Sequence, residues 1–199
     1  MTASRVEPVT GRPPNHASLT RRSSADTDGD VGRILGKLER GGFDYTVVRI
    51  LANSAPVFRP FVLFSDALNH RSVVAAAVRE AVVLAAAART GSRYEWVEHV
   101  PLARRAGLDE AQIAAAGSAS LPEGVLDAEQ ALAVAVTHAV LDGAGVPPSL
   151  WGRAVDTWGT AGVLELLAMV GWWGAFLPAV LGALGLEAPD APAADEGGA

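Results

Sequence analysis

Three residues near the middle of the chain, Ser92, Glu95 and His99, have side chains suited to proton transfer. Their spacing of i, i+3 and i+7 places all three on one face if the segment is helical. An imidazole is the usual proton shuttle near neutral pH, and neighbouring carboxylates favour its protonated, general-acid form. The segment therefore predicts acid–base chemistry, with His99 and Glu95 as catalytic residues.

Glu80 is the carboxylate that could support them from the preceding helix. It lies in a long Ala/Val-rich run, on the same helical stripe as Val73, Ala77 and Leu84. Because burying an unpaired charge is costly, such a carboxylate is either paired or protonated. One interpretation pairs it with an arginine or a backbone amide at a helix edge. The other, which we favour, pairs it with His99 and makes Glu80 a third catalytic candidate.

A metal site is the main alternative use of two carboxylates and a histidine. However, His70 and His138 are remote in the sequence, and no second histidine lies at a ligand spacing from His99. We therefore expect no metal ion and no other cofactor. We expect core packing or solvent contact for His70 and His138.

The aromatic residues around this segment could shape a binding pocket. Trp96 lies beside the reactive face and could form a wall, whereas Tyr94 and Glu98 point to a different face, where packing and solvent contact are the simpler roles. Pro101 removes a helical hydrogen bond and predicts a kink. The candidate substrate-binding residues are Ser92, Trp96 and Tyr94.

The elements that must position these side chains are helices, because apolar residues recur at helical spacing and strand-like alternation is scarce. The sequence predicts an all-α fold of about seven to nine helices. The expected segments are 31–39, 45–51, 61–68, 72–89, 92–106, one from 109, 128–141, 148–158 and one from 160 that Pro178 bends or breaks. Pro56 and Pro60 are expected to bracket a turn.

Several of these boundaries have specific end signals. Gly91 follows the 72–89 run, where glycine commonly ends a helix, and Ser92 is placed to cap the next one. Asp109 with Gln112 and Asp127 with Gln130 each form the pattern of a capping box. These signals place Glu80 and His99 on two consecutive helices.

Composition separates the domain from its ends. Residues 1–30 are polar and lack an apolar signal-peptide core, so we expect a disordered leader, and residues 188–199 are expected to be a disordered tail. Residues 31–187 remain as a single all-α domain. Residues 161–186 are long enough to span a membrane, but they contain Glu165, Pro178 and several glycines, which favours a buried or interface helix pair.

The bulk numbers exclude several classes of protein. The chain has 199 residues, a net charge of −6 and no cysteine. The acidic balance argues against nucleic-acid binding, and the missing thiols exclude disulfides and cysteine catalysis. We expect a cytoplasmic protein that acts on a small molecule, with no nucleic-acid or membrane partner.

A group of aromatic residues in the C-terminal part of the chain is expected to form core or subunit interface. Its members are Trp151, Trp158, Trp172, Trp173 and Phe176.

The motif residues resemble a known family. The pattern of Arg79-Glu80, an apolar helix, then Gly91-Ser92-x-Tyr94-Glu95-Trp96-x-x-His99 is similar to that of the carboxymuconolactone decarboxylase family, which includes the AhpD-type alkylhydroperoxidases. Asp156-Thr157-Trp158 adds to the resemblance, which spans about 43–186. By spacing, Ser92 and Glu95 occupy the two cysteine positions of the peroxidase branch, so thiol peroxidase activity is excluded.

The resemblance implies an AhpD-like all-α fold, a homo-oligomer, commonly a trimer or hexamer, and cofactor-free acid–base chemistry. Three hypotheses follow. The first is a carboxy-lyase of the decarboxylase type acting on a cyclic carboxylated or enolisable substrate, with His99 as general acid/base, Glu80 orienting it, Glu95 transferring a second proton and Ser92 positioning the substrate. The second is a tailoring enzyme of secondary metabolism that catalyses proton transfer, dehydration or cyclisation. The third is a non-catalytic oligomeric binding or scaffold protein.

Overall fold

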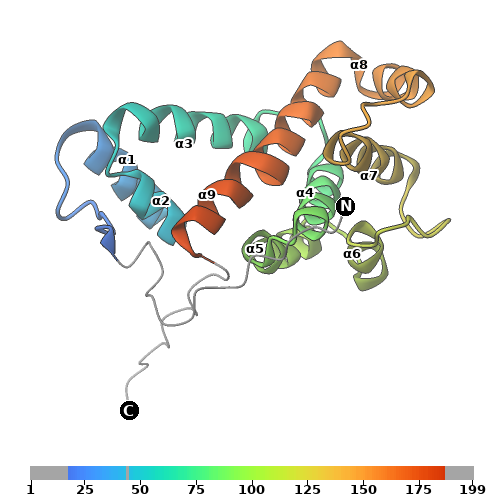
Figure 1. The fold of residues 1–199 in the computed structure, drawn as a ribbon. Coiled ribbons are helices and arrows are strands. Elements are labelled where there is room, and N and C mark those ends of the chain that lie inside the picture. Colours follow the sequence, from blue (N-terminus) through green and yellow to red (C-terminus); the bar gives the residue numbers. More distant parts are fainter. Residues whose placement is uncertain (1–17, 44, 187–199) are drawn as a thin grey trace.

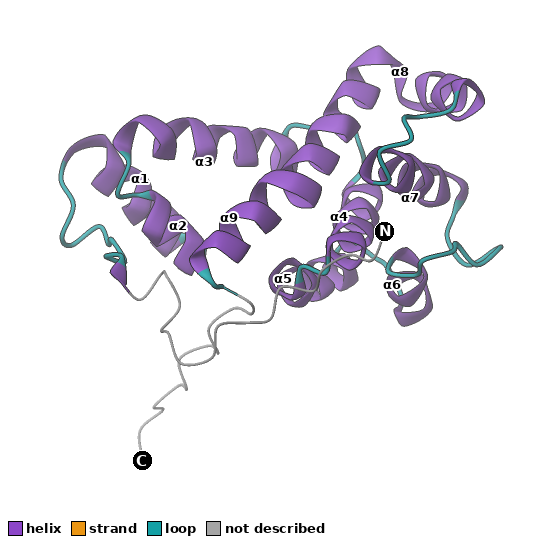
Figure 2. Cartoon of the chain, viewed as in Figure 1, coloured by secondary structure: helices purple, strands orange, loops and turns teal. Residues whose placement is uncertain are grey.

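The computed structural model describes residues 18–43 and 45–186. Apolar residues recur at helical spacing along these segments, and the segments fold into helices joined by turns and loops. No strand occurs in those residues (Figure 2). The helices are α1 (Gly29–Arg40), α2 (Thr46–Leu51), α3 (Ala55–His70), α4 (Ala76–Thr90), α5 (Arg93–Arg105), α6 (Glu110–Ala116), α7 (Ala128–Leu141), α8 (Pro148–Gly171), a π-helical turn η2 (Trp172–Phe176) and α9 (Leu177–Leu184). The predicted all-α fold class is confirmed.

Helix α4 forms the centre of the fold. Its residues 80–87 are all buried, because α5, α6, α7, α8 and η2 all contact it. Figure 1 shows α1, α2 and α3 together at one side and α4–α7 at the other, with α8, η2 and α9 running between the two groups. A helix covered on every side explains why the sequence of α4 is apolar almost throughout.

The long stretch from Pro148 to Leu184 passes a length and hydropathy test for a membrane-crossing helix. In this fold it supplies core residues: Val163, Leu166, Met169 and Val170 are buried in the main apolar cluster. It is also interrupted at Gly159, where φ is 65° and ψ is 177°, a backbone conformation that favours glycine and that ends the first of the two predicted helical pieces. The π-helical turn η2 lies directly before Pro178, the residue expected to bend the stretch.

The turn predicted around Pro56 and Pro60 is wrong, because α3 is continuous from Ala55 to His70. Pro56 lies in the first turn, where a backbone N–H has no helical partner in any case. Pro60 removes one hydrogen bond inside the helix. Burial of Phe58 and Phe61 on the same helix offsets that loss.

The start of the described chain lies partly within the predicted leader. Residues 1–17 of that leader and the whole predicted tail, 188–199, lie outside the described residues. Residues 18–28 contact the helices that follow: the Arg22 N–H donates to the Arg49 carbonyl, and the Ser24 N–H donates to Glu39. Residues 22–24 thus pack on α1 and α2, which places ordered chain before the expected domain start at residue 31.

Candidate active site

A two-residue turn joins α4 to α5 and fixes how they cross. Gly91 adopts the left-handed conformation with φ of 69°, and the Ser92 N–H donates to the Ala87 carbonyl at 2.9 Å. The end of α4 at glycine therefore follows the predicted signal. The turn folds α5 back along α4, so that residues one turn or more from the junction meet on facing sides.

The structure brings Glu80 and His99 into direct contact. The Nδ1 atom of His99 lies 2.8 Å from the Oε2 atom of Glu80, and Glu80 and His99 are 2% and 8% exposed. A carboxylate at Nδ1 favours the tautomer that carries a proton on that nitrogen, and the contact fixes the orientation of the ring. Of the two interpretations of Glu80, the favoured contact with His99 is therefore formed, and the contact with an arginine is formed as well.

Arg79 also contacts Glu80, although adjacent helix residues do not normally face each other. Its Nε atom donates to the Oε1 atom of Glu80 at 3.1 Å, and its Nη1 atom donates to the Asn69 carbonyl at 2.9 Å. Each oxygen of Glu80 thus has its own partner, Arg79 on one and His99 on the other. A buried carboxylate paired on both sides is the arrangement that makes such burial tolerable.

Glu95 lies on the opposite side of the imidazole from Glu80. Its Oε2 atom is 3.5 Å from the Nε2 atom of His99, and the residue is only 4% exposed. Burial raises the pKa of Glu95 from 4.5 to about 7, with His99 opposing the shift and Glu98 adding to it. Glu80, His99 and Glu95 form what we call the acid–histidine row, in which Glu95 exchanges its proton near neutral pH.

Other elements enclose the acid–histidine row. The indole of Trp173, from η2, packs edge-on against the His99 ring with centroids 5.7 Å apart. The pKa of Glu98 is also raised, because the effect of burial is larger than the opposing effect of His99. The pKa of Tyr45, which precedes α2, is raised by burial, by Glu98 and to a smaller extent by Glu95 and Glu80, so this phenol also lies within electrostatic reach of the row.

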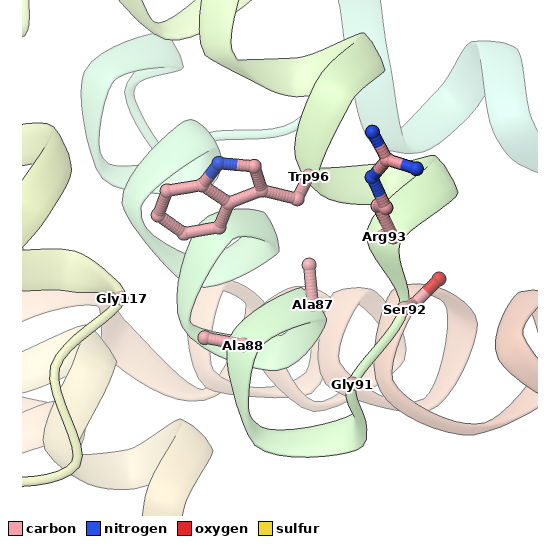
Figure 3. Close-up of a pocket in the computed structure, with 7 residues that line it drawn as sticks. All are labelled: Ala87, Ala88, Gly91, Ser92, Arg93, Trp96 and Gly117. Carbon is pink, nitrogen blue, oxygen red and sulfur yellow. The ribbon is translucent and has the colours of Figure 1, made fainter. Parts of the chain in front are cut away.

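The predicted substrate-binding residues lie elsewhere. Ser92 and Trp96 line a pocket of about 350 Å³ at the start of α5, together with residues of α4 and Gly117 (Figure 3). Glu80, Glu95 and His99 do not line it. Tyr94 lines neither that pocket nor the surface: it is 4% exposed and belongs to the main apolar core, which is the packing role expected for its face.

Two contacts of the row were not predicted from the sequence. Arg79 was noted only as part of a motif, and the one available signal was its position next to a carboxylate in an apolar helix. Trp173 was assigned to core or interface packing, and nothing local to α5 indicates that a residue from η2 reaches His99. The expected kink at Pro101 does not end the helix, since α5 continues to Arg105.

The described residues contain no group of three His, Asp or Glu side chains placed to hold a metal ion. The geometry of the row explains this, because Glu80 and Glu95 contact opposite nitrogens of one imidazole. The chemistry that this arrangement can support is proton transfer between carboxyl groups and an imidazole.

Comparison with known proteins confirms the family resemblance. Residues 55–137 match the profile of the carboxymuconolactone decarboxylase family, and this stretch contains the whole acid–histidine row. The crystal structure of an uncharacterized peroxidase-related protein from Silicibacter sp. TM1040 has the same fold, with a TM-score of 0.72 and 15% sequence identity over 93% of this chain and 96% of that one. A search of curated proteins gives no match. The chain is thus similar to the carboxymuconolactone decarboxylase family over residues 55–137, and its all-α fold is that of the structural neighbour.

Proposed function

We propose that this protein is a cofactor-independent lyase of the carboxymuconolactone decarboxylase type, acting on a cyclic carboxylated or enolisable small molecule. The observation that carries the proposal is the buried acid–histidine row, in which Glu95 has a pKa of about 7 beside a carboxylate-held imidazole. Perturbed carboxyl groups paired with an oriented histidine are typical of general acid–base sites.

The row fits the proton demand of a decarboxylation. When a β,γ-unsaturated carboxylate loses CO2, the electron pair of the broken carbon–carbon bond forms a new double bond between the α and β carbons. The π electrons of the original β,γ double bond then bond a proton at the γ carbon. Protonated Glu95 supplies this proton and becomes a carboxylate. Solvent then returns a proton to Glu95 by way of His99, whose ring Glu80 and Trp173 hold in place.

Thiol chemistry is not available to this chain. Its sequence contains no cysteine, and the position corresponding to the second thiol of the peroxidase branch holds Glu95. A proton-transfer group therefore lies where that branch has a redox group. This difference favours a lyase over an activity like that of the structural neighbour, which is described as peroxidase-related.

The direct test is His99→Ala assayed with carboxymuconolactone as substrate. We expect the turnover rate to fall by about 10²- to 10⁴-fold, the usual contribution of a positioned general acid or base. His70→Ala is the matched control, because His70 is an exposed histidine paired with Asp66 at the end of α3. Undiminished turnover in His99→Ala would reject the proposed role.

Product analysis separates this proposal from the tailoring-enzyme alternative. Release of CO2 supports a carboxy-lyase. A product with the same composition as the substrate supports isomerisation, and a product that has lost water supports dehydration, in both cases by the acid–histidine row. The rate should also fall above about pH 7, because Glu95 then loses the proton that it donates. Glu95→Gln should abolish that pH dependence together with most of the activity.

We also propose that the chain assembles as a homo-oligomer, a trimer or hexamer as the family resemblance implies. Exposed Phe64 and Phe176 flank the buried Trp172, with Phe64–Trp172 and Trp172–Phe176 ring centroids both 5.0 Å apart. Large exposed aromatic side chains in one patch are typical of interaction surfaces. Light scattering on the purified protein tests the proposal, and a monomeric mass would contradict it.

A further inference from the structure

A pocket at the start of α5, beside the face that carries the acid–histidine row, has features of a ligand site that the row does not use. We call it the Trp96 pocket; it lies between the last turn of α4, the first turns of α5 and the end of α6 (Figure 3). Its volume is about 350 Å³, and most of it is open to solvent. A ligand of one ring with a short substituent matches that size.

The apolar walls of the Trp96 pocket are fixed in place. The indole of Trp96 packs directly on the backbone of Gly117: a Cβ atom at Gly117 would lie 2.5 Å from the Cη2 atom of the indole. The φ angle of Gly117 is −80°, so space for the indole, rather than backbone freedom, requires glycine here. Ala87 and Ala88 contribute only methyl groups beneath the indole (Figure 3), which leaves room for a flat group.

The polar groups at the pocket are available to a ligand. Arg93 is exposed, and within the described residues its guanidinium makes no hydrogen bond or ion pair. Ser92 is the N-cap residue of α5, but its hydroxyl does not cap the helix. No acidic residue lines the pocket, so a negatively charged group would meet one cation and no opposing charge.

We propose that the Trp96 pocket binds a small planar organic acid, with the ring against the indole of Trp96 and the carboxylate on Arg93. The flat indole face favours offset stacking with an aromatic or conjugated ring. The guanidinium is planar and binds a carboxylate through two parallel hydrogen bonds, which a neutral ligand cannot reproduce. This site is separate from the acid–histidine row, so the proposal does not depend on the lyase activity.

Calorimetric titration of the full-length protein with benzoate tests the proposal, and benzamide serves as the neutral probe of the same shape. We expect benzoate to bind at least about tenfold more tightly than benzamide, the scale of one charge-assisted hydrogen bond. Arg93→Gln should weaken benzoate binding to the level of benzamide. Ala88→Leu, which fills the slot, should weaken both probes.

Arg105→Gln is the matched control, because Arg105 is also an exposed arginine of α5 but does not line the pocket. It should leave benzoate binding unchanged. Loss of binding in Arg105→Gln but not in Arg93→Gln would overturn the proposal and place the acid on the other face of α5. Absence of benzoate binding to the unmodified protein at millimolar concentration would overturn it as well. Thermal melts of each variant show whether a loss reflects unfolding.

Discussion

Two adjoining faces of α5, one buried and one open, differ in their side chains and in what those side chains can do. On the buried face, Glu95 and His99 are charged or titratable, and their partners come from α4 and from α5 itself. On the open face, Trp96 is apolar and Arg93 has no partner among the described residues. Burial shifts a pKa and suits proton transfer, whereas an accessible, unpaired cation beside a flat wall suits binding. One helix can thus carry acidic proton-transfer groups on one face and a cationic binding group on another, with no carboxylate beside the cation in the pocket.

The largest expected effect comes from breaking the buried face. Glu80→Ala should lower the free energy of unfolding by about 3–5 kcal/mol, because it leaves Arg79 and His99 without the carboxylate that compensates them. Urea denaturation measures this loss. The matched control is Asp142→Ala, which removes the partner of Arg89, another arginine of α4, from a surface pair and should cost less than about 1 kcal/mol. Equal losses in the two variants would contradict the special role of the buried pair.

The second effect is a dependence of stability on pH. The pKa of Glu95 is raised from 4.5 to about 7 in the folded protein, so the folded state binds more protons than the unfolded state between those values. The free energy of unfolding should therefore fall as the pH rises from 4.5 to 7, by up to about 3 kcal/mol, and change little from this cause above pH 7. Glu95→Gln cannot titrate and should remove that fall. An unchanged slope in Glu95→Gln would show that another group causes it.

The third effect concerns the open face. Gly117→Ala should destabilise the protein by about 1–3 kcal/mol, because the new methyl group overlaps the ring of Trp96 and displaces it. Gly152→Ala is the matched control: Gly152 lies inside α8 with open space around it, and alanine there should stabilise the helix by about 0.5–1 kcal/mol. Opposite signs in thermal melts would confirm that the indole requires Gly117. A neutral Gly117→Ala would show that the wall of the pocket is mobile.

The contrast between the faces also shows what the sequence could predict. The contact of Glu80 with His99 was predictable because a single carboxylate in an apolar helix needs a partner, and a suitable group lies on the next helix. The capping boxes of α6 and α7 were predictable for a similar local reason, and both are formed. Local rules succeed where the partners are close in sequence.

The remaining features depend on contacts between distant segments. The edge of Trp173 on His99 and the indole of Trp96 on Gly117 join residues far apart in the chain, and no spacing rule connects them. The continuous α3 shows the converse, since tertiary burial of Phe58 overrode the local signal of Pro60. The walls of the pocket and the orientations of these rings could therefore be determined only from the structure.

The smallest expected change in stability is that of Ser92→Ala, which tests whether the Ser92 hydroxyl caps α5 or is free to bind a ligand. Ser92 occupies the N-cap position of α5 without a capping bond, so Ser92→Ala should change the free energy of unfolding by less than about 0.5 kcal/mol. Asp127 caps α7 through a 2.8 Å bond from the Gln130 N–H, so Asp127→Ala should cost about 1 kcal/mol. Denaturant titration of both variants makes the comparison. If Ser92→Ala costs as much as Asp127→Ala, the hydroxyl caps the helix in solution, and the open face of α5 then offers a ligand only Arg93 and the indole.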